Sequence, residues 1–245
     1  MKTIIDLVLV AILIICAWTG YKKGIIMGIG GILVIILSIY GANLLSGAFS
    51  SGAVPVMKPF VTGFIEGKMV TKQGSDVLGI LDSLNVDTSS TSLEDLIRAD
   101  PSLETTVAVG TFEALGITEN TAKDMSSDVS AAYEKNGGAF TDAITLVLCN
   151  RLAFVVTFIL AFLIILIFLT VIGNITNLSF KIPNLDIVND IVGTLLGIVT
   201  GLIFCTILVW ALKYSGLIIG GDTVSKTVIA KSFMGADRLT KILGY

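Results

Sequence analysis

The stretch Gly20-Tyr21-Lys22-Lys23-Gly24 decides the fold of this chain, because it separates two long apolar runs. The first run covers residues 4–18 and is interrupted only by Asp6, and the second covers residues 25–45 and has no charge. A helix that spans a bilayer needs about 20 mostly apolar residues. The pattern therefore predicts a helical hairpin that crosses a membrane twice. The alternative for the first run is a cleaved signal peptide, which fits less well because no small-x-small cleavage site follows.

Two further apolar runs, over residues 152–173 and 191–212, predict a second hairpin. Of the 245 residues, 54% are apolar and 14% are charged, whereas soluble domains carry about 25% charged residues. We therefore expect an all-α membrane protein with four transmembrane helices arranged as two hairpins. The predicted parts are a hairpin (1–45), a polar lobe (46–150), a second hairpin (151–212) and an amphipathic C-terminal tail (213–245).

The segment between the hairpins, residues 46–150, is acidic, with fourteen Asp and Glu residues against six Lys and Arg residues. Apolar residues recur in it near helical spacing, which predicts helices over residues 62–84, 102–115 and 119–135, the last ended by Gly137. A helical lobe accounts for this recurrence better than a disordered acidic linker does. The tail over residues 222–243 is also amphipathic, and we expect it either in the membrane interface or packed on the protein's own surface.

Charge patterning gives two opposing indications of topology. Lys22 and Lys23 lie in a very short turn, and the positive-inside rule places such a turn in the cytoplasm. The N-terminus, the acidic lobe and the tail would then lie outside. The tail, however, carries five basic and two acidic residues, and a simple count of these charges favours the inverted topology. We expect the N-terminus outside and keep the inverted arrangement as the alternative.

Composition argues against catalytic chemistry. The chain has no histidine, so it cannot build a Ser-His-Asp or Cys-His arrangement or a His-ligated metal site by itself. Its three cysteines, Cys16, Cys149 and Cys205, lie in or beside apolar runs and form no CxxC pair, which is typical of packing residues. There is no dense basic patch for nucleic acid. We predict that the protein is not an enzyme and has no cofactor, no metal site and no nucleic-acid partner.

Glycines recur every fourth residue in two of the apolar runs. Residues four apart share one face of a helix, and glycines on that face let two backbones approach closely. We expect these glycines to pack the four spans within one chain, and the alternative is an oligomer interface or a pore lining. They are Gly20, Gly24, Gly28, Gly193, Gly197 and Gly201.

Asp6 is the ionisable residue most open to a functional interpretation, since charges within membrane helices are rare. Its place near the start of the first run favours a helix cap or an interfacial anchor, because a carboxylate suits the positive end of a helix dipole. A role in transport or proton transfer is the alternative. No charge lies in the middle of any run, which argues against a proton-driven transporter.

Three features together resemble the colicin V production (CvpA) family. They are the acid-bearing start Ile4-Ile5-Asp6-Leu7, the Gly20–Gly24 turn with its long apolar successor, and Asn189-Asp190-Ile191-Val192-Gly193 followed by Gly197 and Gly201. The resemblance covers residues 2–45 and 152–212. Asp190 and Thr200 stand where members often carry basic residues, so a role of those basic residues is not carried over.

The resemblance implies a multi-pass protein of the bacterial cytoplasmic membrane, linked to bacteriocin production or export and to envelope maintenance. We therefore expect an accessory or scaffold factor whose partners are the lipid bilayer and other membrane or envelope proteins. A homo-oligomer of the chain stays open as a further arrangement. The alternative is a small oligomeric channel or transporter. Its polar lining would have to come from few hydroxyl groups, namely those of Ser38, Thr157, Thr170, Thr194, Thr200 and Thr206.

Overall fold

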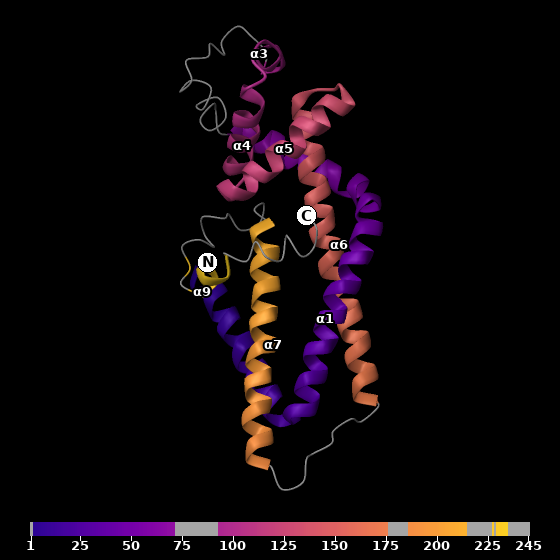
Figure 1. The fold of residues 1–245 in the computed structure, drawn as a ribbon. Coiled ribbons are helices and arrows are strands. Elements are labelled where there is room, and N and C mark those ends of the chain that lie inside the picture. The colour runs from indigo at the N-terminus through magenta and orange to yellow at the C-terminus, as the bar shows by residue number, and fades with distance from the viewer. Residues whose placement is uncertain (1, 72–92, 176–185, 215–226, 228, 235–245) are drawn as a thin grey trace. The chain divides into compact units, whose positions relative to one another are not determined.

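A computed structural model describes residues 2–71, 93–175, 186–214, 227 and 229–234, and every regular element in these residues is a helix. Figure 1 shows them in chain order. The class predicted from the sequence, all-α, is confirmed for this part of the chain. The helices are α1 (Lys2–Thr71), α3 (Leu93–Ala99), α4 (Leu103–Ala114), α5 (Glu119–Asn136), α6 (Phe140–Ile175), α7 (Asp186–Tyr214) and α9 (Ile229–Met234).

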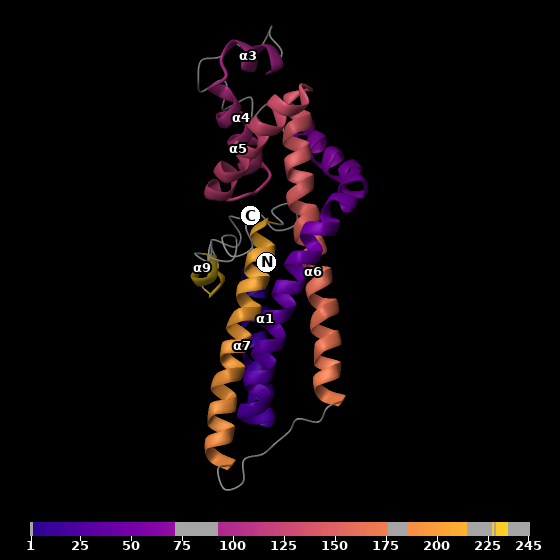
Figure 2. The same cartoon turned by 45° about the vertical axis from the view of Figure 1, so that its right-hand side comes forward.

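Helix α1 reverses direction at Gly24, whose backbone has φ 70° and ψ −170°. Only glycine adopts these angles without strain, because a Cβ would clash with the backbone there. The reversal divides α1 into a first arm, residues 2–23, and a second arm, residues 25–71, which run in opposite directions in Figures 1 and 2. The turn is tighter than the predicted five-residue turn, since Gly20 to Lys23 remain helical.

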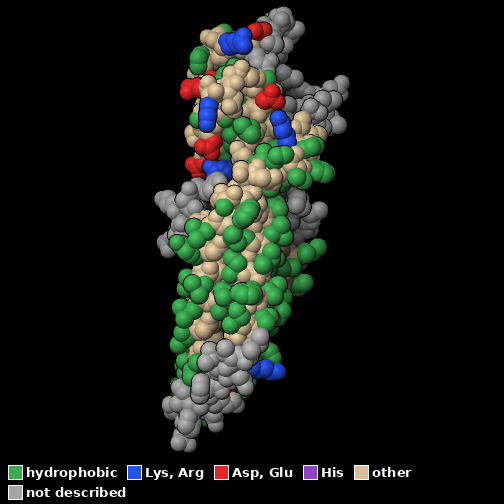
Figure 3. Space-filling model, turned by 90° about the vertical axis from the view of Figure 1, so that its right-hand side faces the viewer, with side chains coloured by type: hydrophobic (Ala, Val, Ile, Leu, Met, Phe, Trp, Pro, Cys, Tyr) green, Lys and Arg blue, Asp and Glu red, His purple; other side chains and the backbone are tan. Residues whose placement is uncertain are grey.

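Three described helices are long and apolar enough to cross a membrane, over Thr3–Gly63, Phe140–Gly173 and Ile187–Leu212. The first of these contains the Gly24 reversal. Large apolar side chains on all three are exposed, for example Leu7, Leu37, Ile164 and Ile191. On the face shown in Figure 3, apolar side chains cover a wide area of the described surface that holds few charged ones. A surface of this kind is stable in lipid and unfavourable in water.

The described chain divides into two compact units. The membrane unit comprises α1 up to Phe49, α6 from Val155, α7 up to Leu212, and α9. The lobe comprises α1 from Ser50, then α3, α4 and α5, and α6 up to Phe154. Two helices therefore continue from one unit into the other, so the predicted ends of the spans at residues 45 and 152 are not helix ends.

The lobe has a core of large buried side chains. Phe112 of α4, Met125 of α5, and Phe140, Ile144 and Leu148 of α6 are fully or almost fully buried in one cluster. Helices α4 and α5 correspond closely to the helices predicted over residues 102–115 and 119–135. Helix α5 ends, as the sequence indicates, at Gly137, which has φ 59° and whose N–H donates to the Tyr133 carbonyl.

Two predictions fall mainly outside the described residues. The helix expected over residues 62–84 is described only as far as Thr71, where α1 ends. Of the amphipathic tail over residues 222–243, the structure describes Thr227 and the short helix α9.

Candidate functional site

The first arm of α1 and helix α7 contact each other backbone to backbone, along the two series of glycines. A Cβ added to Gly20 would lie 2.8 Å from the Cα of Gly197, and one added to Gly193 would lie 2.8 Å from the Cα of Gly24. Real Cβ atoms do not approach so closely, so only glycine fits. We call this contact, formed by Gly20, Gly24, Gly193 and Gly197, the glycine seam.

The remaining two glycines of the series also face neighbouring helices. A Cβ on Gly201 would meet the Cβ of Cys16 at 3.2 Å, and one on Gly28 would meet the Cβ of Leu196 at 3.0 Å. All six glycines singled out in the sequence therefore lie against another segment of the same chain. By contrast, α6 meets α7 through aromatic rings, with ring centroids 5.2 Å apart for Phe158 and Trp210.

Asn189 closes one end of the glycine seam. Its side chain is 6% exposed, and its Oδ1 accepts a hydrogen bond of 3.0 Å from the N–H of Ile25, the first residue after the reversal. This N–H starts a helix and so lacks a partner within it. Asn189 thus acts as an N-cap supplied by another helix, and its amide lies directly against Gly24.

The sequence interpretation missed this role, because it began the fourth apolar run at residue 191, whereas α7 already begins at Asp186. The usable signal was Asn189, two residues before an apolar run whose glycine spacing matches that of the first hairpin.

The two lysines of the reversal lie in different surroundings. The Nζ of Lys22 is 5.3 Å from the centroid of the Trp18 ring, within the range of a cation–π interaction. Trp18 also lies near Tyr21, with ring centroids 6.0 Å apart, and both rings are exposed. Tryptophan, tyrosine and lysine in such a group are typical of the membrane–water interface.

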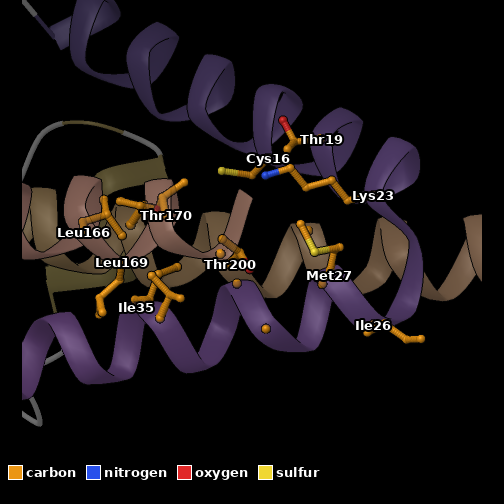
Figure 4. A pocket seen from close by; sticks show the side chains of 18 residues that line it. Cys16, Thr19, Lys23, Ile26, Met27, Ile35, Leu166, Leu169, Thr170 and Thr200 are labelled. Carbon is orange, nitrogen blue, oxygen red and sulfur yellow. The ribbon is translucent and has the colours of Figure 1, made fainter. Parts of the chain in front are cut away.

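Lys23 instead lines a cavity of about 360 Å³ within the membrane unit. Both arms of α1, together with α6 and α7, form its walls, which are largely apolar. In Figure 4 the Lys23 side chain extends towards Cys16, and Met27, Thr170 and Thr200 lie around the same space.

Asp6 caps a helix, but not the one expected. It lies inside the first arm of α1, and its Oδ1 accepts hydrogen bonds of 3.2 and 3.4 Å from the N–H groups of Ile229 and Ala230. These two residues begin α9, so Asp6 joins the start of the chain to its C-terminal region. The expectation that Asp6 caps its own helix is wrong, because α1 begins at Lys2 and places Asp6 beyond the first turn.

The cysteines lie within the packed helices. Cys149 and Cys205 are buried, and the Cys205 thiol donates to the Leu9 carbonyl oxygen across 3.7 Å. Within the described residues, no three or more Cys, Asp or Glu side chains are grouped closely enough to hold a metal ion.

Residues 121–237 match the model of the family described as colicin V production protein. Over this segment, somewhat less than half of its length, the chain is similar to the colicin V production protein family. The match starts within α5 and includes the whole of α6, α7 and α9. Searches of the curated proteins and of the solved structures found no match.

The family segment supplies one side of the glycine seam and one side of the Asn189 and Asp6 contacts. Gly193, Gly197 and Asn189 lie inside it, whereas their partners in α1 lie outside it. The resemblance is thus confirmed for residues 152–212, and for residues 2–45 it stays a prediction.

Proposed function

We propose that this chain is an accessory or scaffold factor of the bacterial cytoplasmic membrane that supports production or export of a toxin, and with it maintenance of the cell envelope. The observation that carries the proposal is the family segment, residues 121–237, because it contains the α7 half of the glycine seam. A scaffold needs a fixed arrangement of its spans, and close backbone packing provides one.

The proposal includes four membrane crossings, two of them made by the arms of α1. The first arm offers 22 residues before Gly24, and a span needs roughly 17–25. The interfacial group of Trp18, Tyr21 and Lys22 supports placing the reversal at a membrane surface, on the cytoplasmic side by the positive-inside rule. The lobe then lies on the opposite side of the membrane, where it can meet envelope or export partners.

Single-cysteine labelling of intact cells tests this topology. In a background with Cys16, Cys149 and Cys205 replaced, we expect a membrane-impermeant reagent to label Ser127→Cys, whose position on α5 is exposed. Tyr21→Cys should react only after the membrane is permeabilised. The reverse pattern would invert the protein and move the search for partners to the cytoplasm.

A non-enzymatic role agrees with the chemistry of the chain. It has no histidine, and three of the six hydroxyl groups considered for a pore lining form hydrogen bonds within their own helix. Ser38, Thr194 and Thr206 each donate to the carbonyl oxygen four residues earlier, at 2.7, 2.7 and 2.8 Å. A pore lining would need these groups to face water or a passing solute, so the same bonds also disfavour the channel alternative.

The decisive experiment is a deletion with complementation in the bacterium that encodes the chain. We expect deletion to lower the amount of secreted bacteriocin and the wild-type chain to restore it. Gly197→Leu should fail to restore secretion even where the protein reaches the membrane, whereas Gly47→Leu should succeed, because a Cβ at Gly47 would meet nothing within 4 Å. Unchanged secretion after deletion would refute the proposal.

A separate flux assay addresses the channel alternative. Purified protein in liposomes should release no trapped ions or small solutes above the level of empty liposomes. Release that depends on protein concentration would instead favour the channel.

A further inference from the structure

The cavity of the membrane unit has no role in the packing or in the proposed function. Its volume of about 360 Å³ falls within the range of roughly 300–1,000 Å³ that is usual for small-molecule sites. Two of its wall residues, Gly30 and Gly31, differ from the seam glycines, because a Cβ at either position would meet nothing within 4 Å. Glycine at these two positions leaves the cavity open, whereas glycine in the seam allows the backbones of α1 and α7 to touch.

The cavity has the depth of one lipid leaflet. Its wall residues on the second arm of α1 run from Ile26, next to the reversal, to Ile35. At about 1.5 Å per residue this stretch rises about 14 Å, roughly half of the 30 Å hydrocarbon core of a bilayer. An apolar space of this length has the dimensions of a single acyl chain.

The positive charge of Lys23 lies at the end of this space that is next to the reversal. Cys16, Thr19 and Lys23 share one face of the first arm, and helical side chains lean towards the N-terminus of their helix. Lys23 therefore leans back along the arm into the cavity, as Figure 4 shows. No carboxylate of the described residues forms an ion pair with it, including Asp190 on the adjoining helix α7. Lys23 is an exposed residue at the edge of the apolar walls, so its ammonium group is accessible to an anionic ligand.

We propose that the cavity binds one acyl chain of an anionic phospholipid, with the lipid phosphate at Lys23. Lysine is a common phosphate ligand. The apolar walls suit the acyl chain of a phospholipid, and the phosphate of the same lipid can reach Lys23. Lys23 is the one charged residue among the described wall residues, which favours an anionic ligand. This inference goes beyond the proposed function and concerns purified protein alone.

Native mass spectrometry of the purified full-length chain tests the headgroup preference. The protein is titrated with phosphatidylglycerol and with phosphatidylethanolamine that carry the same acyl chains. We expect the wild type to retain several-fold more of the anionic lipid, and Lys23→Gln to retain the two lipids about equally. Lys22→Gln is the matched control and should keep the preference, because Lys22 lies over the Trp18 ring.

A second pair of variants tests the acyl-chain site. Gly30→Leu places a side chain in the cavity and should lower retention of both lipids several-fold, whereas Gly47→Leu, on the same helix but outside the cavity, should not. Both variants should melt like the wild type, since neither position has a neighbour within 4 Å.

Three results would overturn the proposal. They are equal retention of the two lipids by the wild type, an equal loss in Lys22→Gln and Lys23→Gln, or unchanged retention in Gly30→Leu. None of these results concerns toxin secretion. The lipid site can therefore be refuted without refuting the proposed function, and the reverse also holds.

Discussion

The membrane unit and the lobe are both helical, but their helices pack in opposite ways. In the membrane unit, α1 and α7 touch at Gly20, Gly193 and Gly197, while large side chains such as Leu7 point outwards. In the lobe, Phe112 and other large side chains are fully buried, and the charged groups lie outside.

The difference follows from the solvent of each unit. Burying a leucine in a bilayer gains little, because lipid tails are as apolar as the side chain, so close backbone contact must hold the helices together. In water, burial of apolar area contributes about 25 cal/mol per Å², and a core of large side chains is the stable solution. The two units should therefore respond in opposite ways to adding and to removing side-chain volume.

The largest effect is expected from adding volume to the glycine seam with Gly197→Leu. A Cβ there would lie 3.1 Å from the Cα of Ala17, a backbone atom that cannot rotate away. We expect a loss above the roughly 1–3 kcal/mol that is usual for overpacking. Both tryptophans, Trp18 and Trp210, belong to the membrane unit, so thermal unfolding followed by tryptophan fluorescence reports this unit.

Gly47→Leu adds the same volume where a Cβ meets nothing, and its stability should stay within about 0.5 kcal/mol of the wild type. If Gly197→Leu melted like Gly47→Leu, the seam would not hold the two helices together.

Removing volume should matter most in the lobe. Phe112→Ala empties a fully buried position, and such substitutions cost about 3–5 kcal/mol. Hydrogen exchange of α4 and α5 in the full-length protein should accelerate by about two orders of magnitude or more, at 1.4 kcal/mol per factor of ten. Leu7→Ala in the membrane unit removes an exposed side chain and should cost much less. A loss of stability as large as that of Phe112→Ala would contradict the difference between the two units.

A smaller effect is expected at the reversal, where Asn189 caps the second arm. Asn189→Ala leaves the Ile25 N–H without its acceptor, at a cost of about 0.5–2 kcal/mol. Asn189→Asp keeps the acceptor oxygen and should retain more of the stability. The measurement is again tryptophan fluorescence, and equal melting temperatures for the Ala variant and the wild type would exclude the cap.

The smallest effect is expected on the surface of the lobe, where the Nζ of Lys123 lies 2.6 Å from Glu119 Oε1. The hydrogen bond and the charge of Lys123 lower the pKa of Glu119, and Glu119 raises the pKa of Lys123. Any stabilisation from Glu119 is therefore present above its unfolded pKa and lost as the pH falls through the lowered pKa. Stabilisation from Lys123 is lost as the pH rises through its raised pKa.

An NMR titration of the full-length protein in micelles measures this pair. Lys123→Ala should raise the pKa of Glu119 back towards its ordinary value, because the hydrogen bond and the charge that lower it are lost. The pKa of Asp100 should not move, because hydrogen bonds from Ser102 lower it instead. A Glu119 pKa that is unchanged by the substitution would show that the pair does not form in solution.

The sequence by itself determined the helical class, the apolar spans, the reversal near Gly24 and the positions of α4 and α5. These features depend on hydropathy, spacing and end signals such as Gly137, which are local properties of the chain. Tertiary structure alone decided which segments meet. It placed Gly20 against Gly193, brought Asn189 to the Ile25 N–H and carried Asp6 to the start of α9. Each of these contacts joins residues more than 160 positions apart in the chain, and no local pattern encodes a partner at that distance.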